Sequence, residues 1–285
     1  MQSIQNIHTI AVCGAGTMGA GIAQVCAAAG FHTRLFDLNE KALQQGYAQI
    51  SGNLQKAVDK GKMPAQQMTD ILGRITLCHE LEACKAEVVI EAIVEKVEAK
   101  AALFNQLAAI NHEDAIFATN TSSLSVTEIA RQVANPQRVG GLHFFNPAHL
   151  MQLVEVVKGE QTSTHTAHLL YALVLEMGKT PVRVKDAPGF IVNRVARHYY
   201  LEAMEAVEAG IADIAAADRL LEAAGFRMGP FALMDLIGND VNYAVTVSLY
   251  EAFQKAPRFK PGAMQAALVA KGELGRKTGK GFYKY

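Results

Sequence analysis

The stretch of sequence that decides the fold runs from residue 7 to residue 37 and reads IHTIAVCGAGTMGAGIAQVCAAAGFHTRLFD. Its apolar start predicts a short strand over residues 7–13, and its alanine-rich middle predicts a helix as far as Ala29. A second short strand over residues 33–37 ends on the carboxylate of Asp37, 18 residues beyond Gly19. Between the first strand and the helix lies a glycine turn, which consists of Gly14, Ala15, Gly16, Thr17, Met18 and Gly19.

This order of strand, glycine turn, helix and strand has the features that bind a dinucleotide. Gly14 allows a tight turn, Gly16 lets the backbone approach a pyrophosphate, and Gly19 lets the helix pack closely on the strand. The helix N-terminus offers free N–H groups and a positive dipole end to the phosphates. Asp37 can accept hydrogen bonds from both ribose hydroxyls and repels a 2′-phosphate. The motif therefore predicts NAD as the cofactor, in preference to NADP.

The same stretch has a second interpretation, as a membrane anchor. Residues 10–31 form a run of 22 residues without a charge, which is long enough to cross a bilayer. The run contains five glycines and many alanines, so it is much less hydrophobic than a leucine-rich span. Residues 1–9 contain no Lys or Arg, so they lack the basic region of a signal peptide. We expect a cytoplasmic protein without a membrane segment.

Composition excludes several classes of protein. The chain has 285 residues, enough for about two domains with real cores. Its 27 basic and 27 acidic residues give no net charge, which argues against nucleic acid as a partner. The cysteines have no C-x-x-C spacing, so we expect reduced thiols, no disulfide framework and no metal. These cysteines are Cys13, Cys26, Cys78 and Cys84.

The pattern of the chain changes at K-D-A-P-G, residues 185–189. Before it, strands at 87–91, 115–119, 138–143, 153–157 and 180–184 alternate with helices at 40–62, 97–110, from 125, and at 164–177. This alternation predicts an α/β fold with a Rossmann-type, doubly wound, mainly parallel sheet. After it, helical stretches at 190–209, 213–224, 231–250 and 262–271 predict an all-helical domain. We expect an NAD-binding domain over residues 1–185 and a helical substrate-binding and dimerisation domain over residues 186–285.

The first of these C-terminal helices, residues 190–209, is apolar around most of its circumference. Such a helix is usually buried on several sides. This predicts a domain interface or a subunit interface.

A candidate acid–base pair lies in the last part of the predicted sheet. His143 ends the strand 138–143, and histidine exchanges protons near neutral pH. Glu155 lies in an apolar strand, where an ionised carboxylate is costly unless it is paired. An imidazole is a suitable partner for it. The alternative is that Glu155 meets an arginine and His143 is only packed.

Collinear motifs along the whole chain resemble the L-3-hydroxyacyl-CoA dehydrogenase family. They include N-T-S-S-L at 120–124, H-F-F-N-P at 143–147, P-G-F-I-V-N-R at 188–194, G-P-F at 229–231 and L-G-R-K-T-G-K-G-F-Y-K-Y at 274–285. The resemblance implies an NAD-dependent enzyme that oxidises a 3-hydroxyacyl-CoA, with 3-hydroxybutyryl-CoA as the expected substrate. It also implies a free-standing homodimer that assembles through the helical domain.

The resemblance implies a role for each site residue. His143 would be the general base, oriented by Glu155, while Ser122 and Asn193 would hold the substrate's 3-oxygen and thioester region. Lys56 would meet the coenzyme A phosphates. Because the chain has no net charge, the helix dipole and lysines such as Lys56 and Lys100 would attract the anionic ligands. The expected cofactor site comprises Gly14, Gly16, Thr17, Met18, Gly19, Asp37, Ala92, Glu95, Lys100, Asn120 and Asn146.

Three alternatives stay open at this point. A non-catalytic relative could share the fold. The 6-phosphogluconate and 3-hydroxyisobutyrate dehydrogenase group uses a catalytic lysine where this chain has Asn193. A metal-dependent hydrolase built on His165 and His168 would lack nearby acidic or cysteine ligands. Departures from the family pattern, which bear on acyl-chain preference, occur at His149, His198 and Arg227.

Overall fold

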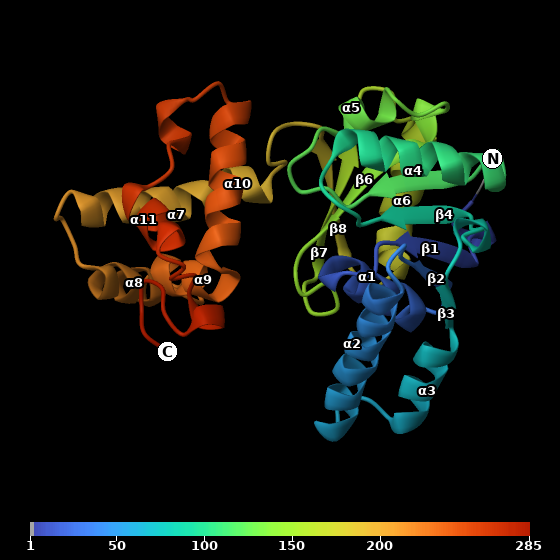
Figure 1. The fold of residues 1–285 in the computed structure, drawn as a ribbon, viewed down its shortest axis with the longest axis horizontal. Helices are drawn as coiled ribbons and strands as arrows, with labels where there is room; N and C mark the ends of the chain where they lie inside the picture. The colour runs from blue at the N-terminus through green and yellow to red at the C-terminus, as the bar shows by residue number, and fades with distance from the viewer. Residues whose placement is uncertain (1–2) are drawn as a thin grey trace. The chain divides into compact units, whose positions relative to one another are not determined.

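The structure is a computed structural model that describes residues 3–285. The chain divides into two compact units, one reaching to Ala187 and the other spanning Pro188–Tyr285 (Figure 1). Each unit has its own core.

The first unit is built on one eight-stranded sheet with the order β3-β2-β1-β4-β5-β6-β7-β8. All neighbours are parallel except β6 and β7, which are antiparallel. The order of the first six strands is the one that binds dinucleotides in doubly wound proteins. The expected fold class is therefore confirmed. The strands are β1 (Thr9–Cys13), β2 (His32–Phe36), β3 (Ile75–Cys78), β4 (Val88–Glu91), β5 (Ile116–Thr119), β6 (Val139–Phe144), β7 (Leu153–Lys158) and β8 (Thr180–Lys185).

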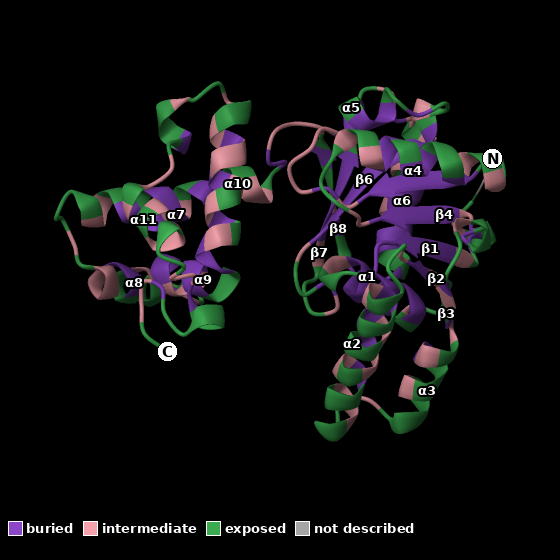
Figure 2. Ribbon diagram, viewed as in Figure 1, coloured by how far each residue is buried: buried purple, intermediate pink, exposed green. Residues whose placement is uncertain are grey.

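Helices cover both faces of this sheet, so each face has its own hydrophobic core. Successive side chains of a strand point alternately into one core and the other. In β1, Ile10 and Val12 pack with α1, α2, α3 and α6, whereas Ala11 and Cys13 pack with α4 and α5. Figure 2 shows the strands as the most buried layer of the unit. The helices are α1 (Thr17–Ala28), α2 (Glu40–Asp59), α3 (Ala65–Gly73), α4 (Val97–Ile110), α5 (Val126–Ala130) and α6 (Thr164–Glu176).

The structure adds two elements that the sequence pattern did not predict. The predicted helix 40–62 ends at Asp59, and α3 and the edge strand β3 follow it. β3 has only four residues and buries just Ile75 and Cys78, so it carries no clear alternation of its own. Its pairing with β2 makes it a strand.

The second unit is entirely helical apart from short bridges near the C-terminus. Its core forms around Met204 of α7, Ala217 of α8, and Phe231 and Met234 of α9. Its helices are α7 (Val192–Glu208), α8 (Ile214–Ala223), α9 (Pro230–Ile237), α10 (Asn239–Ala252) and α11 (Ala263–Ala270). Short 3-10 turns in the two units are Ile4–Asn6, Leu81–Ala83, Pro136–Arg138, Pro257–Phe259 and Arg276–Thr278.

One expectation about this unit was wrong. The stretch 231–250 is not one helix, because Gly238 has a φ of 101° and separates α9 from α10. Within the chain, α7 buries Tyr200 and Met204 and leaves Val195 67% exposed.

The uncharged run 10–31 is divided between β1, the glycine turn and α1, so it is no continuous span. Among the helices of residues 3–285, none has both the length and the hydropathy needed to cross a membrane.

Candidate active site

His143 and Glu155 form a buried pair on two neighbouring strands. They are direct partners in the antiparallel register of β6 and β7. The distance from His143 Nδ1 to Glu155 Oε2 is 2.7 Å, and the two residues are 5% and 0% exposed. An ionised carboxylate can only accept, so His143 Nδ1–H donates to Glu155 Oε2. The ring of Phe145 packs against the imidazole with a centroid distance of 4.4 Å.

The glycine turn has the shape that a pyrophosphate requires. Gly14 has a φ of 101°, and a Cβ there would lie 2.5 Å from the carbonyl oxygen of Ala92. A Cβ on Gly19 would lie 1.7 Å from the carbonyl oxygen of Gly14. A Cβ on Gly16, the residue before the first turn of α1, would meet nothing within 4 Å. Gly14 and Gly19 are thus required by the fold, whereas Gly16 leaves open space at a helix N-terminus.

A hollow of about 670 Å³ adjoins this turn and contains Asp37 in its wall. Asp37 Oδ2 accepts a hydrogen bond from the Ala15 N–H at 2.8 Å, and its Oδ1 accepts one from the Asn39 N–H at 2.8 Å. Each carboxylate oxygen can accept a further bond, so both can still receive ribose hydroxyls. The donors and the space therefore fit the adenosine half of NAD. Other residues of the wall include Gly14, Gly16, Leu38, Ala92 and Val94.

Lys100 holds two carboxylates together beside this hollow. It is 1% exposed, and its Nζ lies 2.6 Å from Glu91 Oε1 and 3.0 Å from Glu95 Oε2. Burial raises the pKa of Glu91 despite the nearby ammonium group. The expectation that the Lys100 charge attracts anionic ligands was wrong, because two carboxylates already neutralise it.

The loop that carries Ser122 is fastened to this charged group. Glu95 Oε1 accepts hydrogen bonds from the Thr121 hydroxyl, from the Ser122 N–H at 3.2 Å and from the Ser123 hydroxyl at 3.2 Å. Burial by itself would raise the pKa of Glu95, but Lys100 and the hydrogen-bond donors outweigh burial and lower this pKa below its ordinary value. The carboxylate therefore stays ionised and fixes the position of the loop after β5.

Asn120 joins the end of β5 to the end of β6. Its Oδ1 accepts a hydrogen bond from the Phe144 N–H at 2.9 Å. Because parallel strands end at the same edge of a sheet, Asn120, Ser122 and His143 all lie at the carboxyl edge, where ligands bind in doubly wound folds.

Comparison with known proteins agrees with this geometry. The family profile "3-hydroxyacyl-CoA dehydrogenase, NAD binding domain" matches residues 9–187, and the profile "3-hydroxyacyl-CoA dehydrogenase, C-terminal domain" matches residues 189–285.

The chain belongs to the 3-hydroxyacyl-CoA dehydrogenase family.

Among its relatives is the 3-hydroxyadipyl-CoA dehydrogenase of Escherichia coli, which is 48% identical over 98% of this chain and 59% of its own length. The probable 3-hydroxybutyryl-CoA dehydrogenase of Bacillus subtilis is 41% identical over 98% of both chains. The crystal structure of (S)-3-hydroxybutyryl-CoA dehydrogenase from Ralstonia eutropha has a TM-score of 0.93 at 38% identity, covering 98% of this chain and 99% of its own. This chain thus spans about three-fifths of the first relative and nearly all of the other two.

Family membership confirms the expected cofactor class and sets aside the dehydrogenase group with a catalytic lysine. Of the expected cofactor residues, Thr17 and Met18 open α1, and the exposed Asn146 follows β6. Asn193 lies in the first turn of α7, in the second unit. Lys56 lies in the last turn of α2.

Lys56 borders a second hollow of about 670 Å³ in the first unit. No sequence motif indicated another lysine there, Lys179, which is 8% exposed and donates to the carbonyl oxygens of Ala148 and Met151 at 2.8 Å each. Burial lowers the pKa of Lys179, and burial together with Lys179 lowers the pKa of His149. Basic residues dominate the charge of this hollow: Lys56, Lys60, Lys62, His149 and Lys179, with Glu176 as the acidic one.

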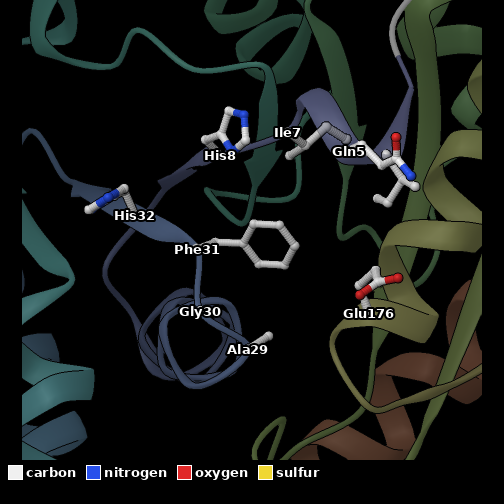
Figure 3. Close-up of a pocket in the computed structure, with 9 residues that line it drawn as sticks. Gln5, Ile7, His8, Ala29, Gly30, Phe31, His32 and Glu176 are labelled. Carbon is white, nitrogen blue, oxygen red and sulfur yellow. The ribbon is translucent and has the colours of Figure 1, made fainter.

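A third hollow, of about 440 Å³, lies at the amino edge of the sheet (Figure 3). His8 and His32 line it where β1 and β2 begin, and Phe31 and Glu176 lie on its walls. None of the expected site residues borders it. The carboxyl edge is therefore the candidate site.

Proposed function

We propose that this chain is an NAD-dependent L-3-hydroxyacyl-CoA dehydrogenase that interconverts (S)-3-hydroxybutyryl-CoA and acetoacetyl-CoA. The observation that carries the proposal is the buried contact between His143 and Glu155 at the sheet edge that also carries the glycine turn. A proton-exchanging imidazole beside a dinucleotide site is what alcohol oxidation at C3 requires.

In this mechanism His143 Nε2 accepts the proton of the 3-hydroxyl group. NAD, held by the glycine turn and Asp37, would supply the acceptor for the hydride from C3. Glu155 holds the ring through Nδ1 and stabilises the imidazolium that forms, as a buried carboxylate does in other acid–base pairs. In the opposite direction the protonated His143 donates to the 3-keto oxygen. Ser122 and Asn193 would hold the 3-oxygen and the thioester region.

The cofactor would lie along the glycine turn with its adenosine ribose on Asp37. Gly14, Gly16, Thr17, Met18 and Gly19 would receive the pyrophosphate, with the open side of Gly16 toward it. Fixed donors of this kind need no rearrangement when charge arrives. The remaining proposed contacts come from Ala92, Glu95, Asn120 and Asn146, while Lys100 would act by holding Glu95.

Lys56 would meet the phosphates of coenzyme A in the basic hollow between α1, α2 and the loop after β6. Four lysines and a histidine around an apolar floor suit an anionic ligand with an apolar part. Removal of the Lys56 charge should raise KM for the thioester and leave the turnover number unchanged.

A second candidate substrate is 3-hydroxyadipyl-CoA. The observation in its favour is the 48% identity to the Escherichia coli protein of that name. Both candidates need the same chemistry at C3 and differ at the far end of the acyl chain.

We also propose a cytoplasmic homodimer that assembles through the helical unit. Large apolar side chains are exposed there, among them Val195 at 67%, Ile211 at 79% and Leu220 at 70%. A symmetric contact between two copies would cover such a surface. Light scattering at micromolar concentration tests this, and a monomeric mass would contradict it.

The decisive experiment follows NADH absorbance with acetoacetyl-CoA, with NADPH in a parallel reaction. We expect turnover with NADH and a rate at least about tenfold lower with NADPH, since Asp37 repels the 2′-phosphate. The matched control is the His143→Gln variant. A chain that binds NADH and the thioester but never consumes NADH would be a non-catalytic relative, and the proposal would fail.

A further inference from the structure

Among residues 3–285, Arg197 is a buried cation without an acidic partner. It lies on α7 and is 3% exposed. Its Nη1 donates to the Asn242 carbonyl oxygen at 3.0 Å, to Asn242 Oδ1 at 2.9 Å and to the Thr246 hydroxyl at 2.8 Å. The ring of Tyr200 lies 5.2 Å from the guanidinium carbon. All of these partners are neutral.

Within residues 3–285, Arg197 is one of several buried cations without an ion pair, together with Arg138 and Lys179. Within residues 3–285, no carboxylate oxygen lies within ion-pair distance, 4.0 Å, of its guanidinium group. Its Nε is buried and has no hydrogen-bond partner. Burial lowers the pKa of Arg197 to about 10, so the group is still charged at neutral pH. An isolated buried charge is costly, and proteins that retain one usually pair it with an anion.

The position of Arg197 indicates which anion could pair with it. Arg197 follows Asn193 by four residues on the same helix, so both side chains lie on one face, about 6 Å apart along the axis. Asn193 is the residue that we propose for the reacting end of the acyl group. In a six-carbon dicarboxylic acyl group, the terminal carboxylate lies three bonds beyond C3. That length is close to one turn of the helix.

We propose that Arg197 receives a carboxylate at the far end of the acyl chain and makes dicarboxylic 3-hydroxyacyl-CoA thioesters the preferred substrates. The inference rests on the proposed function and names its substrate class. Because Nη1 is already bonded to α10, the carboxylate meets the edge formed by Nε and Nη2, which suits two parallel hydrogen bonds. Nε is closed to water in the present conformation, so binding includes a small movement of neighbouring side chains.

The test compares two acyl chains of equal length, one ending in a carboxylate and one in a methyl group. These are 3-hydroxyadipyl-CoA and 3-hydroxyhexanoyl-CoA, with 3-hydroxybutyryl-CoA as the short reference. We expect the wild-type kcat/KM to favour the adipyl over the hexanoyl thioester by about 100-fold, as buried charge pairs at binding sites do. In Arg197→Met this ratio should fall to about one, while kcat/KM for the butyryl thioester changes less than about threefold.

The control is Arg138→Met. Arg138 is also buried, at 9% exposure, and donates to the carbonyl oxygens of His112, Glu113 and Ala115 in the first unit. Its loss should lower stability without changing the adipyl-to-hexanoyl ratio. If Arg197→Met lowers kcat/KM equally for all three thioesters, Arg197 only supports the fold and the inference is overturned.

Two further outcomes separate this inference from the proposed function. If the wild type is active on all three thioesters but does not distinguish adipyl from hexanoyl, the inference is overturned while the proposed function stands, whether or not Arg197→Met folds. If no thioester is turned over, the proposed function fails. Calorimetric binding of adipyl-CoA and hexanoyl-CoA to the wild-type protein then still tests Arg197, since equal affinities would overturn its role.

Discussion

His143 and Glu155 are separated by 12 residues in the chain but lie directly opposite each other across β6 and β7, with 2.7 Å between Nδ1 and Oε2. Opposite residues of an antiparallel pair have their Cβ atoms about 5 Å apart on the same face of the sheet. The hairpin register therefore sets the contact, and burial of both side chains keeps water from competing for it. This pair is the basis of the first prediction.

Replacing His143 by Gln should leave NAD affinity unchanged and lower kcat by about 10³-fold, because the amide cannot exchange a proton near neutral pH. Glu155→Gln keeps the shape but loses the charge that stabilises the imidazolium, so we expect a loss of about 10²-fold. Stopped-flow turnover and fluorescence titration with NADH measure the two effects. Near-wild-type turnover in His143→Gln would show that His143 does not accept the proton of the hydroxyl group.

Alanine substitutions at Gly14 and Gly16 should have different effects on stability and on NAD binding. A methyl group at Gly14 would lie 2.5 Å from the Ala92 carbonyl oxygen, and the φ of 101° disfavours any residue with a Cβ. Gly14→Ala should therefore lower the free energy of unfolding by about 2 kcal/mol. Gly16→Ala meets nothing within 4 Å and should leave stability within about 0.5 kcal/mol. It should still weaken NAD binding at least about tenfold, because the methyl group occupies the pyrophosphate space. Unchanged NAD affinity in Gly16→Ala would place the phosphates elsewhere.

Removing the buried ammonium of Lys100 should destabilise the first unit. In Lys100→Met, Glu91 is left buried beside Glu95 without a cation, which costs about 3 kcal/mol in comparable cases. The double variant Glu91→Gln, Lys100→Met should recover part of the loss. Urea denaturation measures both, with the exposed Lys60→Met as control. Equal free energies of unfolding for Lys100→Met and the wild type would mean that the Lys100 ion pairs contribute little to stability.

Asp240 gives a prediction about pH. Its carboxylate contacts Lys277 Nζ at 2.6 and 2.7 Å, and this hydrogen-bonded ammonium lowers the pKa of Asp240 below its ordinary 3.8. A lowered pKa means that the contribution to stability is present above pH 3.8 and is lost as the pH falls through the folded value. Because the pair is partly exposed, Asp240→Asn should cost only about 0.5 kcal/mol at pH 7.

Denaturant titrations at pH 7 and pH 3 of wild type and Asp240→Asn check this. The difference in free energy of unfolding between wild type and Asp240→Asn should become smaller at pH 3. It should also become smaller in high salt, because salt screens exposed charges. An equal difference at both pH values would show that the ion pair is not its cause.

Much of the first unit could be predicted from the sequence because its signals are local. The turn at Gly14 needs a residue without a Cβ, and the run from Val88 to Ile90 is apolar because both faces of its strand are covered. Helix α4 begins and ends where its pattern predicts, at Val97 and Ile110. β3 could not be found this way, since an edge strand of four residues takes its structure from its neighbour.

In the second unit the apolar pattern across residues 231–250 continues through Gly238, so it predicts one helix instead of two. Only the backbone conformation at Gly238 shows the break. The same limit applies to α7, whose apolar residues do not reveal which of them the chain itself buries.

The sequence by itself determined the dinucleotide turn, most of the order of strands and helices, and the identity of the acid–base candidates, since these depend on residue type and short-range spacing. Only the tertiary structure decided which charges are already neutralised. Lys100 and Arg197 are both basic residues on helices, yet one is held by two carboxylates and the other has none within ion-pair distance among residues 3–285. Their different roles follow from contacts between residues that the sheet register and the helix packing bring together, and no local pattern encodes those contacts.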